Sequence, residues 1–156
     1  MPAKVPPKTV RPASGLLLSL TAILAILGQA ILGHPSGLAA AENPALEVSF
    51  EFGPGNKGPR GPSPAIMVKG IPDGTVRLEA ELSDLNKPNF RHGGGVYELQ
   101  GEVGEATIPA GALTRRYKGP YPPRNSTHDY VFKITAVGPD GQILATGAAQ
   151  RPFTGM

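Results

Sequence analysis

The sequence of 156 residues contains no cysteine and no tryptophan. Without cysteine, the chain has no disulfide framework, no thiolate nucleophile and no cysteine ligand for a metal ion. A domain of this kind depends on its hydrophobic core for stability. The length leaves room for one domain of ordinary size and not for two.

Acidic residues are missing from the first 41 positions. The first one is Glu42, whereas Lys4, Lys8 and Arg11 precede it and account for the whole formal net charge of +3. From Glu42 onward there are 12 Lys and Arg against 12 Asp and Glu, a balance of zero. A neutral domain lacks the basic footprint that nucleic acid binding requires, so we expect no nucleic acid partner.

The N-terminal segment has the three parts of a secretory signal. A basic start is followed by residues 15–33, a stretch of 19 residues without charge, and Ala39 and Ala41 then give the small-x-small pattern of a signal peptidase site. We predict an apolar helical signal peptide over residues 1–41 and a periplasmic or secreted domain over residues 42–156. The alternative is an uncleaved membrane anchor, because 19 apolar residues nearly span a bilayer. The basic flank places the domain outside the cytoplasm under either interpretation.

The rest of the chain is rich in residues that interrupt secondary structure. The sequence has 21 glycines and 18 prolines, and no window shows a sustained helical period. Residues 75–82 and 129–137 alternate apolar and polar side chains, as half-buried strands do. Further strands are predicted at residues 46–52, 65–69, 96–102, 106–108 and 142–148. Many short strands indicate an all-β, antiparallel sandwich with Greek-key-like connections.

Two connections have a recognisable composition. Residues 138–141 (GPDG) predict a hairpin turn, because proline presets one dihedral angle and glycine tolerates a positive one. Residues 53–64 (GPGNKGPRGPSP) are predicted to be neither strand nor helix, because proline removes amide donors and glycine costs entropy. This segment is therefore interpreted as a loop.

Two segments carry a more specific signal. The first contains Ser63-Pro64, Gly70-Ile71-Pro72-Asp73-Gly74-Thr75, Asp84-Leu85-Asn86-Lys87-Pro88 and His92-Gly93-Gly94-Gly95. The second contains Tyr117-Lys118-Gly119-Pro120-Tyr121-Pro122-Pro123 and His128-Asp129-Tyr130-Val131-Phe132. Together they resemble the phosphatidylethanolamine-binding protein family, including its bacterial and Raf kinase inhibitor-like members. The resemblance covers residues 63–149 and implies a β-sandwich of that family's type, with a small surface pocket for phosphate-like anions.

The resemblance also implies which residues line the pocket. They match the family's acidic segment, the histidine after it, the proline loop and the final histidine and tyrosine: Asp84, Pro88, His92, Gly119, Pro120, Pro122, Pro123, His128 and Tyr130. Three positions depart from the family pattern. Asn86 replaces the second acidic residue, Asp129 stands where arginine is common, and the tryptophan that usually flanks the first histidine is missing.

These residue types suit an anion site. Histidine donates hydrogen bonds, more strongly when protonated, and a neighbouring aspartate fixes its tautomer. Tyr117 or Tyr130 can add a hydroxyl donor, and the prolines stiffen the loop. Each residue also has a structural interpretation: Asp84 as a turn residue, Tyr130 and Phe132 as core, and Gly93 to Gly95 as a bend or bulge.

The sequence therefore favours an exported binding protein for phosphate, a phospholipid headgroup or a similar small anion. It indicates no catalysis and no cofactor, since there is no G-x-S-x-G elbow and no serine with an evident base. The alternatives are a structural or partner-binding module with a decayed pocket, and a metal site formed by Asp84, His92 and His128. Membrane contact is expected only through an uncleaved leader, and nothing indicates the oligomeric state.

Overall fold

The computed structural model describes residues 44–156, so the predicted signal peptide over residues 1–41 lies outside the described part. No helix of the described part is long and apolar enough to span a bilayer. The elements in chain order are β1 (Glu47–Phe50), a 3-10 turn η1 (Pro54–Asn56), β2 (Ile66–Ile71), β3 (Arg77–Asp84), β4 (Arg91–Glu98), β5 (Gly104–Ile108), β6 (Thr127–Val137) and β7 (Ile143–Thr154).

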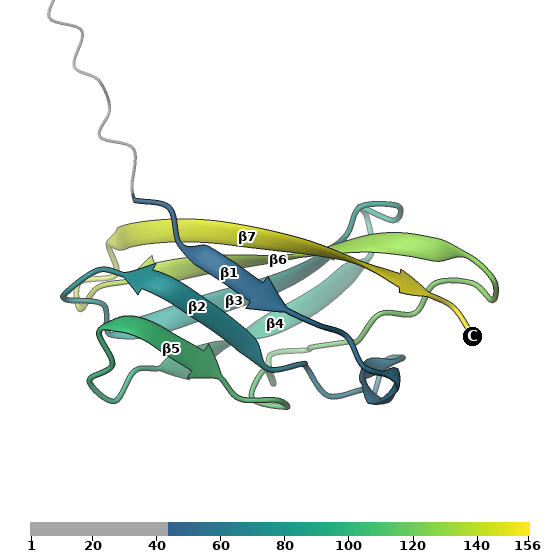
Figure 1. The fold of residues 1–156 in the computed structure, drawn as a ribbon, viewed down its shortest axis with the longest axis horizontal. Helices are drawn as coiled ribbons and strands as arrows, with labels where there is room; N and C mark the ends of the chain where they lie inside the picture. The colour runs from purple at the N-terminus through teal and green to yellow at the C-terminus, as the bar shows by residue number, and fades with distance from the viewer. Residues whose placement is uncertain (1–43) are drawn as a thin grey trace, which may run out of the picture. The chain divides into compact units, whose positions relative to one another are not determined.

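The strands form two sheets that pack face to face (Figure 1). One sheet has the strand order β1-β2-β5 and the other β4-β3-β6-β7. Every pairing between neighbouring strands is antiparallel. The chain passes from one sheet to the other after β2, after β4 and again after β5. The predicted all-β antiparallel sandwich is confirmed.

The alternating side chains of both sheets fill the space between them. In β3 the buried positions include Leu78, Ala80 and Leu82, and in β6 they include Phe132 and Ile134. Full burial of a side chain such as Phe132 contributes about 1.5–3 kcal/mol. The period-two pattern of the two predicted strands therefore marks the core correctly.

The hairpin turn at residues 138–141 is also confirmed. The amide of Gly138 donates to the carbonyl of Gln142 at 2.9 Å, and the amide of Gly141 donates to the carbonyl of Gly138 at 3.0 Å. Gly141 has a φ of 79°, the left-handed conformation that favours glycine. β6 and β7 leave this turn as the longest strand pair of the fold.

The bounds of other predicted elements were wrong. The strand predicted at residues 96–102 is β4, which runs from Arg91 to Glu98, because pairing with β3 draws the glycine run into the sheet despite its low strand preference. β7 continues to Thr154 through Pro152, which an edge strand tolerates. Within the predicted loop 53–64, residues 54–56 form the single turn η1, where the Asn56 side chain accepts from the Gly53 amide at 2.7 Å.

The glycine run of β4 serves the packing of the chain on itself. A Cβ on Gly94 would lie 1.8 Å from the carbonyl oxygen of Ala80, and one on Gly93 would lie 2.4 Å from that of Arg116. The pairing of β3 with β4 shifts register at this point, between Glu81 and Ser83. The interpretation of Gly93 to Gly95 as a bend or bulge therefore holds, and the backbone that approaches these glycines is the protein's own.

Candidate functional site

Four of the predicted site residues meet at one end of the sandwich. Asp84 is the last residue of β3, His92 is the second residue of β4, and His128 and Tyr130 lie at the start of β6. All four are buried, and the pairing of β3 with β6 places Asp84 opposite Tyr130. We call these four side chains the histidine cluster.

Asp84 connects the cluster to the loop that follows β3. Its Oδ1 accepts hydrogen bonds from the amides of Asn86 at 2.8 Å and Lys87 at 3.0 Å, and its Oδ2 lies 2.8 Å from Nδ1 of His128. Burial raises the pKa of the carboxyl, but the hydrogen bonds from His128 and from the Asn86 amide outweigh it, so the pKa lies below its ordinary value. Asp84 is thus both a turn residue and an ionised partner of a histidine.

The two histidines are held in the same way, each through Nδ1. Nδ1 of His128 donates to Asp84, and Nδ1 of His92 donates to the carbonyl of Lys118 at 2.9 Å. A carbonyl and a carboxylate only accept, so each neutral ring carries its proton on Nδ1. The Nε2 atoms take part in no hydrogen bond among residues 44–156. Both histidines therefore keep one ring nitrogen available.

Tyr130 lies between the histidines in the interior. Its ring centroid is 5.3 Å from that of His92, nearly perpendicular to it, and 6.4 Å from that of His128. Its hydroxyl accepts from the amide of Tyr121 at 3.2 Å. Burial, together with the negative charge of Asp84, raises the pKa of this phenol, so the hydroxyl keeps its proton. Tyr130 is thus a core residue, as its alternating strand predicts, and its ring lies between the two histidines.

Tyr117 was the other candidate hydroxyl donor, and it lies elsewhere. Its ring stacks on Phe132 with an interplanar angle of 7°, and its hydroxyl has no partner among the described residues. Burial raises the pKa of this phenol as well.

The proline loop, residues 117–123, packs next to the histidine cluster. Gly119, Pro120 and Pro122 are buried, and the loop is tied to the turn after η1, because Gly58 donates to Pro120 at 2.8 Å and accepts from Gly119 at 3.0 Å. A Cβ on Gly119 would lie 1.9 Å from the carbonyl oxygen of Asn56. Two predicted residues lie at the margin. Pro123 is exposed, and so is Pro88 in the loop 85–90.

Sequence reasoning missed two residues at this site, Phe90 and Lys118. The ring of Phe90 lies 4.7 Å from that of His92 and is 47% exposed, so it covers the histidine from the solvent side. Nζ of Lys118 lies 5.0 Å from the centroid of the Phe90 ring, a cation–π contact. The aromatic residue two positions before His92 was the available signal.

Asn86, one of the departures from the family pattern, has a defined place. Its side-chain oxygen accepts from the amide of Asp129 at 2.9 Å, next to His128. The Asn86 side chain thereby connects the loop 85–90 to the start of β6.

The cluster is nearly closed to solvent. Asp84 is 4% exposed, His92 2% and His128 9%. None of these three side chains lines any of the five surface depressions found on the described domain. Within residues 44–156, no group of three or more His, Cys, Asp or Glu side chains is arranged to hold a metal ion. The alternative of a metal site at Asp84, His92 and His128 finds no support in this geometry.

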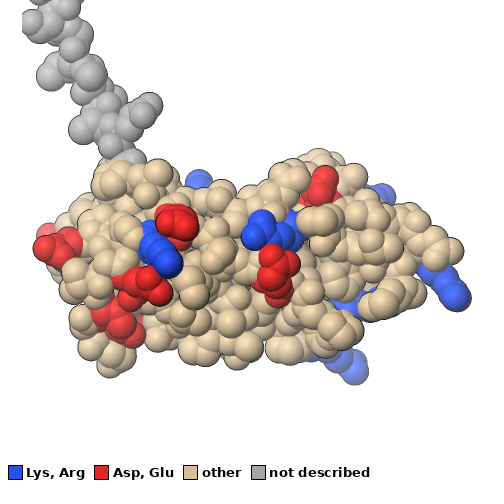
Figure 2. Space-filling model, in the orientation of Figure 1, with Lys and Arg blue, Asp and Glu red and all other residues tan. Residues whose placement is uncertain are grey.

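The charges that balance in the sequence are separated in space. At the cluster end, the loops 51–65, 85–90 and 109–126 carry seven cations, Lys57, Arg60, Lys87, Arg115, Arg116, Lys118 and Arg124, and one acid, Glu51. At the opposite end, the loops 72–76, 99–103 and 138–142 carry Asp73, Glu102 and Asp140 and no cation. Figure 2 shows acidic side chains gathered toward the left and basic ones toward the right. The histidine cluster therefore lies at the positive end of the domain.

Comparisons with known proteins bear on the fold. The sequence matches no protein-family model and no curated protein. Among solved structures, it is similar to a crystal structure described as that of a phosphatidylethanolamine-binding protein homologue from Chlamydia trachomatis, with a TM-score of 0.52 and 19% sequence identity. The similarity covers 72% of this chain and 99% of that chain. It confirms the predicted type of β-sandwich, and at this identity it establishes the fold alone.

Proposed function

We propose that this chain is an exported binding protein for a small oxyanion, such as phosphate or the phosphate of a phospholipid headgroup. The observation that carries the proposal is that Asp84, His92 and His128 lie around the ring of Tyr130 at the positive end of the sandwich. Each histidine leaves its Nε2 without a partner among the described residues. Two ring nitrogens and a cationic surround suit an anion. Export rests on the basic, apolar and small-residue parts of the N-terminal sequence.

Binding of the anion is coupled to protonation of the histidines. Since Nδ1 already carries the proton of each neutral ring, Nε2 can donate to an anion only when the ring becomes an imidazolium. Asp84 accepts from His128 in both states and stabilises the charged ring. Binding of the anion and uptake of a proton by the ring are therefore linked, and we expect affinity to be higher at acidic pH than at neutral pH.

Entry of the ligand requires movement at the surface. His92 is almost fully buried in the structure, with Phe90 lying over its ring. Phe90 itself is half-exposed and belongs to the loop 85–90, whose residues are all exposed. Swinging this ring outward uncovers His92 without disturbing the strands. The cation–π contact with Lys118 is the interaction that must be broken.

We propose binding rather than catalysis, without a cofactor. Ser63 is the one fully buried serine of the described residues. Its hydroxyl oxygen accepts hydrogen bonds from the amides of Gly111 and Leu113 at 3.1 and 3.4 Å, so it connects two loops of the domain. The histidines contact a carboxylate and a carbonyl. This arrangement orients donors, and it places no nucleophile beside a base.

Titration calorimetry with sulfate between about pH 5.5 and 8 tests the proposal. Sulfate keeps the same charge over this range, whereas phosphate takes up a proton at about pH 6. We expect sulfate to bind more tightly at the acidic end of that range. His128→Ala should lose about tenfold or more in affinity, and Asp140→Ala in the opposite turn should change nothing. Equal affinity at both pH values, or in His128→Ala, would contradict it.

A second candidate function is a structural or partner-binding module in which the pocket is closed. The low exposure of the three polar side chains favours it. The two functions differ in one measurement. A closed module shows no binding of millimolar sulfate or phosphoethanolamine at any pH, even in Phe90→Ala, where the cover over His92 has been removed.

A further inference from the structure

A second group of cations lies outside the histidine cluster. Arg91, Arg115, Arg116 and Lys118, with the single acid Glu81, line a surface depression of about 530 Å³, which we call the arginine groove. Arg91 is exposed whereas His92 is buried, because successive residues of a strand point to opposite faces. The groove is therefore on the outer side of β4, away from the interior where the cluster lies.

The cations of the groove are not neutralised by neighbouring acids. The salt bridges of residues 44–156 join Lys69 to Glu105, Arg77 to Glu79, His128 to Asp84 and Arg151 to Glu51, so none involves a groove cation. Glu81 lies opposite Lys133 in the pairing of β3 with β6, so a cation outside the groove is its neighbour on the next strand. Four positive charges therefore share one depression with one acid.

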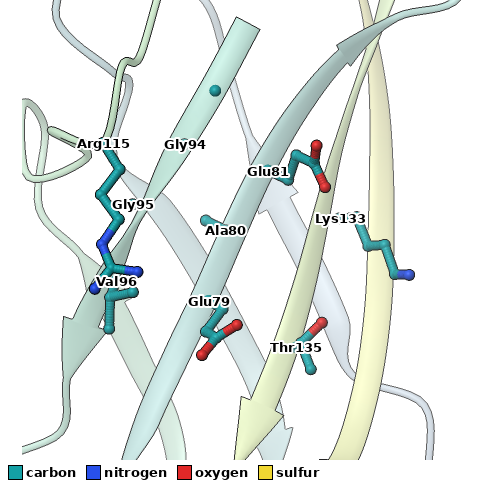
Figure 3. Close-up of a pocket in the computed structure, with 10 residues that line it drawn as sticks. Glu79, Ala80, Glu81, Gly94, Gly95, Val96, Arg115, Lys133 and Thr135 are labelled. Carbon is teal, nitrogen blue, oxygen red and sulfur yellow. The ribbon is translucent and has the colours of Figure 1, made fainter. Parts of the chain in front are cut away.

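The adjoining face of the sheet is open enough for the groove to extend over it. Figure 3 shows Arg115 lying along β4 with its guanidinium beside Val96, and Glu81 and Lys133 on the two strands next to it. This adjoining depression is lined by the glycines of β4 and by the acidic residues Glu79 and Glu81, of which Glu79 is paired with Arg77. Arg115 therefore borders both the arginine groove and this second depression.

The backbone that carries these cations is fixed at several points. Arg115 exchanges two hydrogen bonds with Gly94, at 2.9 and 3.1 Å, and the amide of Lys118 donates to the carbonyl of His92 at 2.7 Å. Arg116 between them has a φ of 55°, a left-handed conformation that is rare outside glycine. Because the backbone of this site is already ordered, ligand binding has to order only the side chains.

We propose that the arginine groove is a second binding site, which takes a multivalent oxyanion carrying several phosphate or sulfate groups. The guanidinium group presents a planar pair of donors that matches two oxygens of such a group. Four cations in one place repel each other, and a ligand with several negative charges relieves more of this repulsion than a single anion does. The volume of about 530 Å³ is in the range of small-molecule sites and exceeds what one phosphate fills.

Tripolyphosphate is the probe that tests this site, measured by calorimetry on the full domain. We expect the double variant Arg91→Gln/Arg115→Gln to bind it about tenfold or more weakly than the unmodified protein. Lys57→Gln/Lys87→Gln is the matched control, because it removes the same charge from the same end outside the groove. An equal loss in both double variants, or no binding by the unmodified protein, overturns the proposal.

Two further variants separate this site from the histidine cluster and from simple charge. His128→Ala should keep its affinity for tripolyphosphate, and loss of binding there would assign the ligand to the cluster instead. Arg91→Lys/Arg115→Lys keeps the charge and removes the planar donor pairs, so we expect an intermediate loss. Affinity equal to that of the unmodified protein would contradict recognition by guanidinium groups. Thermal unfolding of each variant shows that it is folded.

Discussion

The two ends of the sandwich differ in what they bury. All four buried polar or charged side chains of the described residues, Ser63, Asp84, His92 and His128, belong to the cluster end. The opposite end closes with short turns such as residues 138–141, whose hydrogen bonds are mostly between backbone groups. Burying polar groups costs free energy unless each is paired. The cluster end retains several such groups, surrounded by cationic loops, and it is the end at which we place the proposed binding site, whereas the opposite end carries acidic turns that connect strands.

The largest effect is expected where the buried polar network is cut. Asp84→Ala leaves Nδ1 of His128 and the amide of Asn86 without their acceptor, while the amide of Lys87 keeps only the main-chain carbonyl of residue 84 at 3.2 Å. We therefore expect the free energy of unfolding to fall by about 2–4 kcal/mol. Urea denaturation measures it. Asp140→Ala at the opposite end should change stability by less than about 0.5 kcal/mol. Similar losses in both variants would remove the difference between the ends.

Acid should weaken the cluster end specifically. The pKa of Asp84 is lowered in the folded state, so the unfolded chain binds the proton more readily, and stability rises with pH across this titration. The contribution is complete above the ordinary aspartate value of about 3.9 and is lost as the pH falls through the folded pKa. Urea midpoints between pH 2 and 6, as a rough window around that value, should vary less in Asp84→Asn than in the unmodified protein. Identical pH profiles would mean that Asp84 is not responsible.

A smaller effect is expected from opening the cover over His92. Phe90→Ala removes a half-exposed ring, so the cost in stability should stay near or below about 1 kcal/mol. His92 becomes accessible, and its reaction with a histidine-modifying reagent, followed by mass spectrometry, should become several-fold faster, roughly as for an exposed imidazole. Tyr121→Ala, at another exposed aromatic of this end, is the control. An unchanged rate at His92 would show that Phe90 is not its cover.

The smallest effect concerns single surface charges. Lys87→Gln at the cluster end should weaken sulfate binding about twofold at low salt, and Glu102→Gln at the opposite end should leave it within error. Calorimetry at two ionic strengths measures both. A loss that persists at high salt in Lys87→Gln would indicate direct contact rather than the field of the positive end.

What the sequence could predict follows from the range of the interactions involved. The alternation in β3 and β6 is local, so both strands and their buried faces were predictable, and the motifs indicated Asp84, His92, His128 and Tyr130. The strand through Gly93 and the contact of Lys118 with Phe90 were not, because they depend on segments that meet only in the folded chain. Charge separation was hidden for the same reason, since composition does not reveal which loops share an end.

The clamp between Gly58 and the proline loop has a consequence for the order of folding. Its two hydrogen bonds join segments about sixty residues apart in the chain. Closing so long a loop costs conformational entropy, and the contacts that offset this cost form only when most of the structure is in place. Strands that pair with close neighbours in sequence, such as β6 with β7, can form earlier. We therefore expect the proline loop to be among the last parts to assemble. Ligand binding during refolding would then report the final step of folding and not the collapse that precedes it.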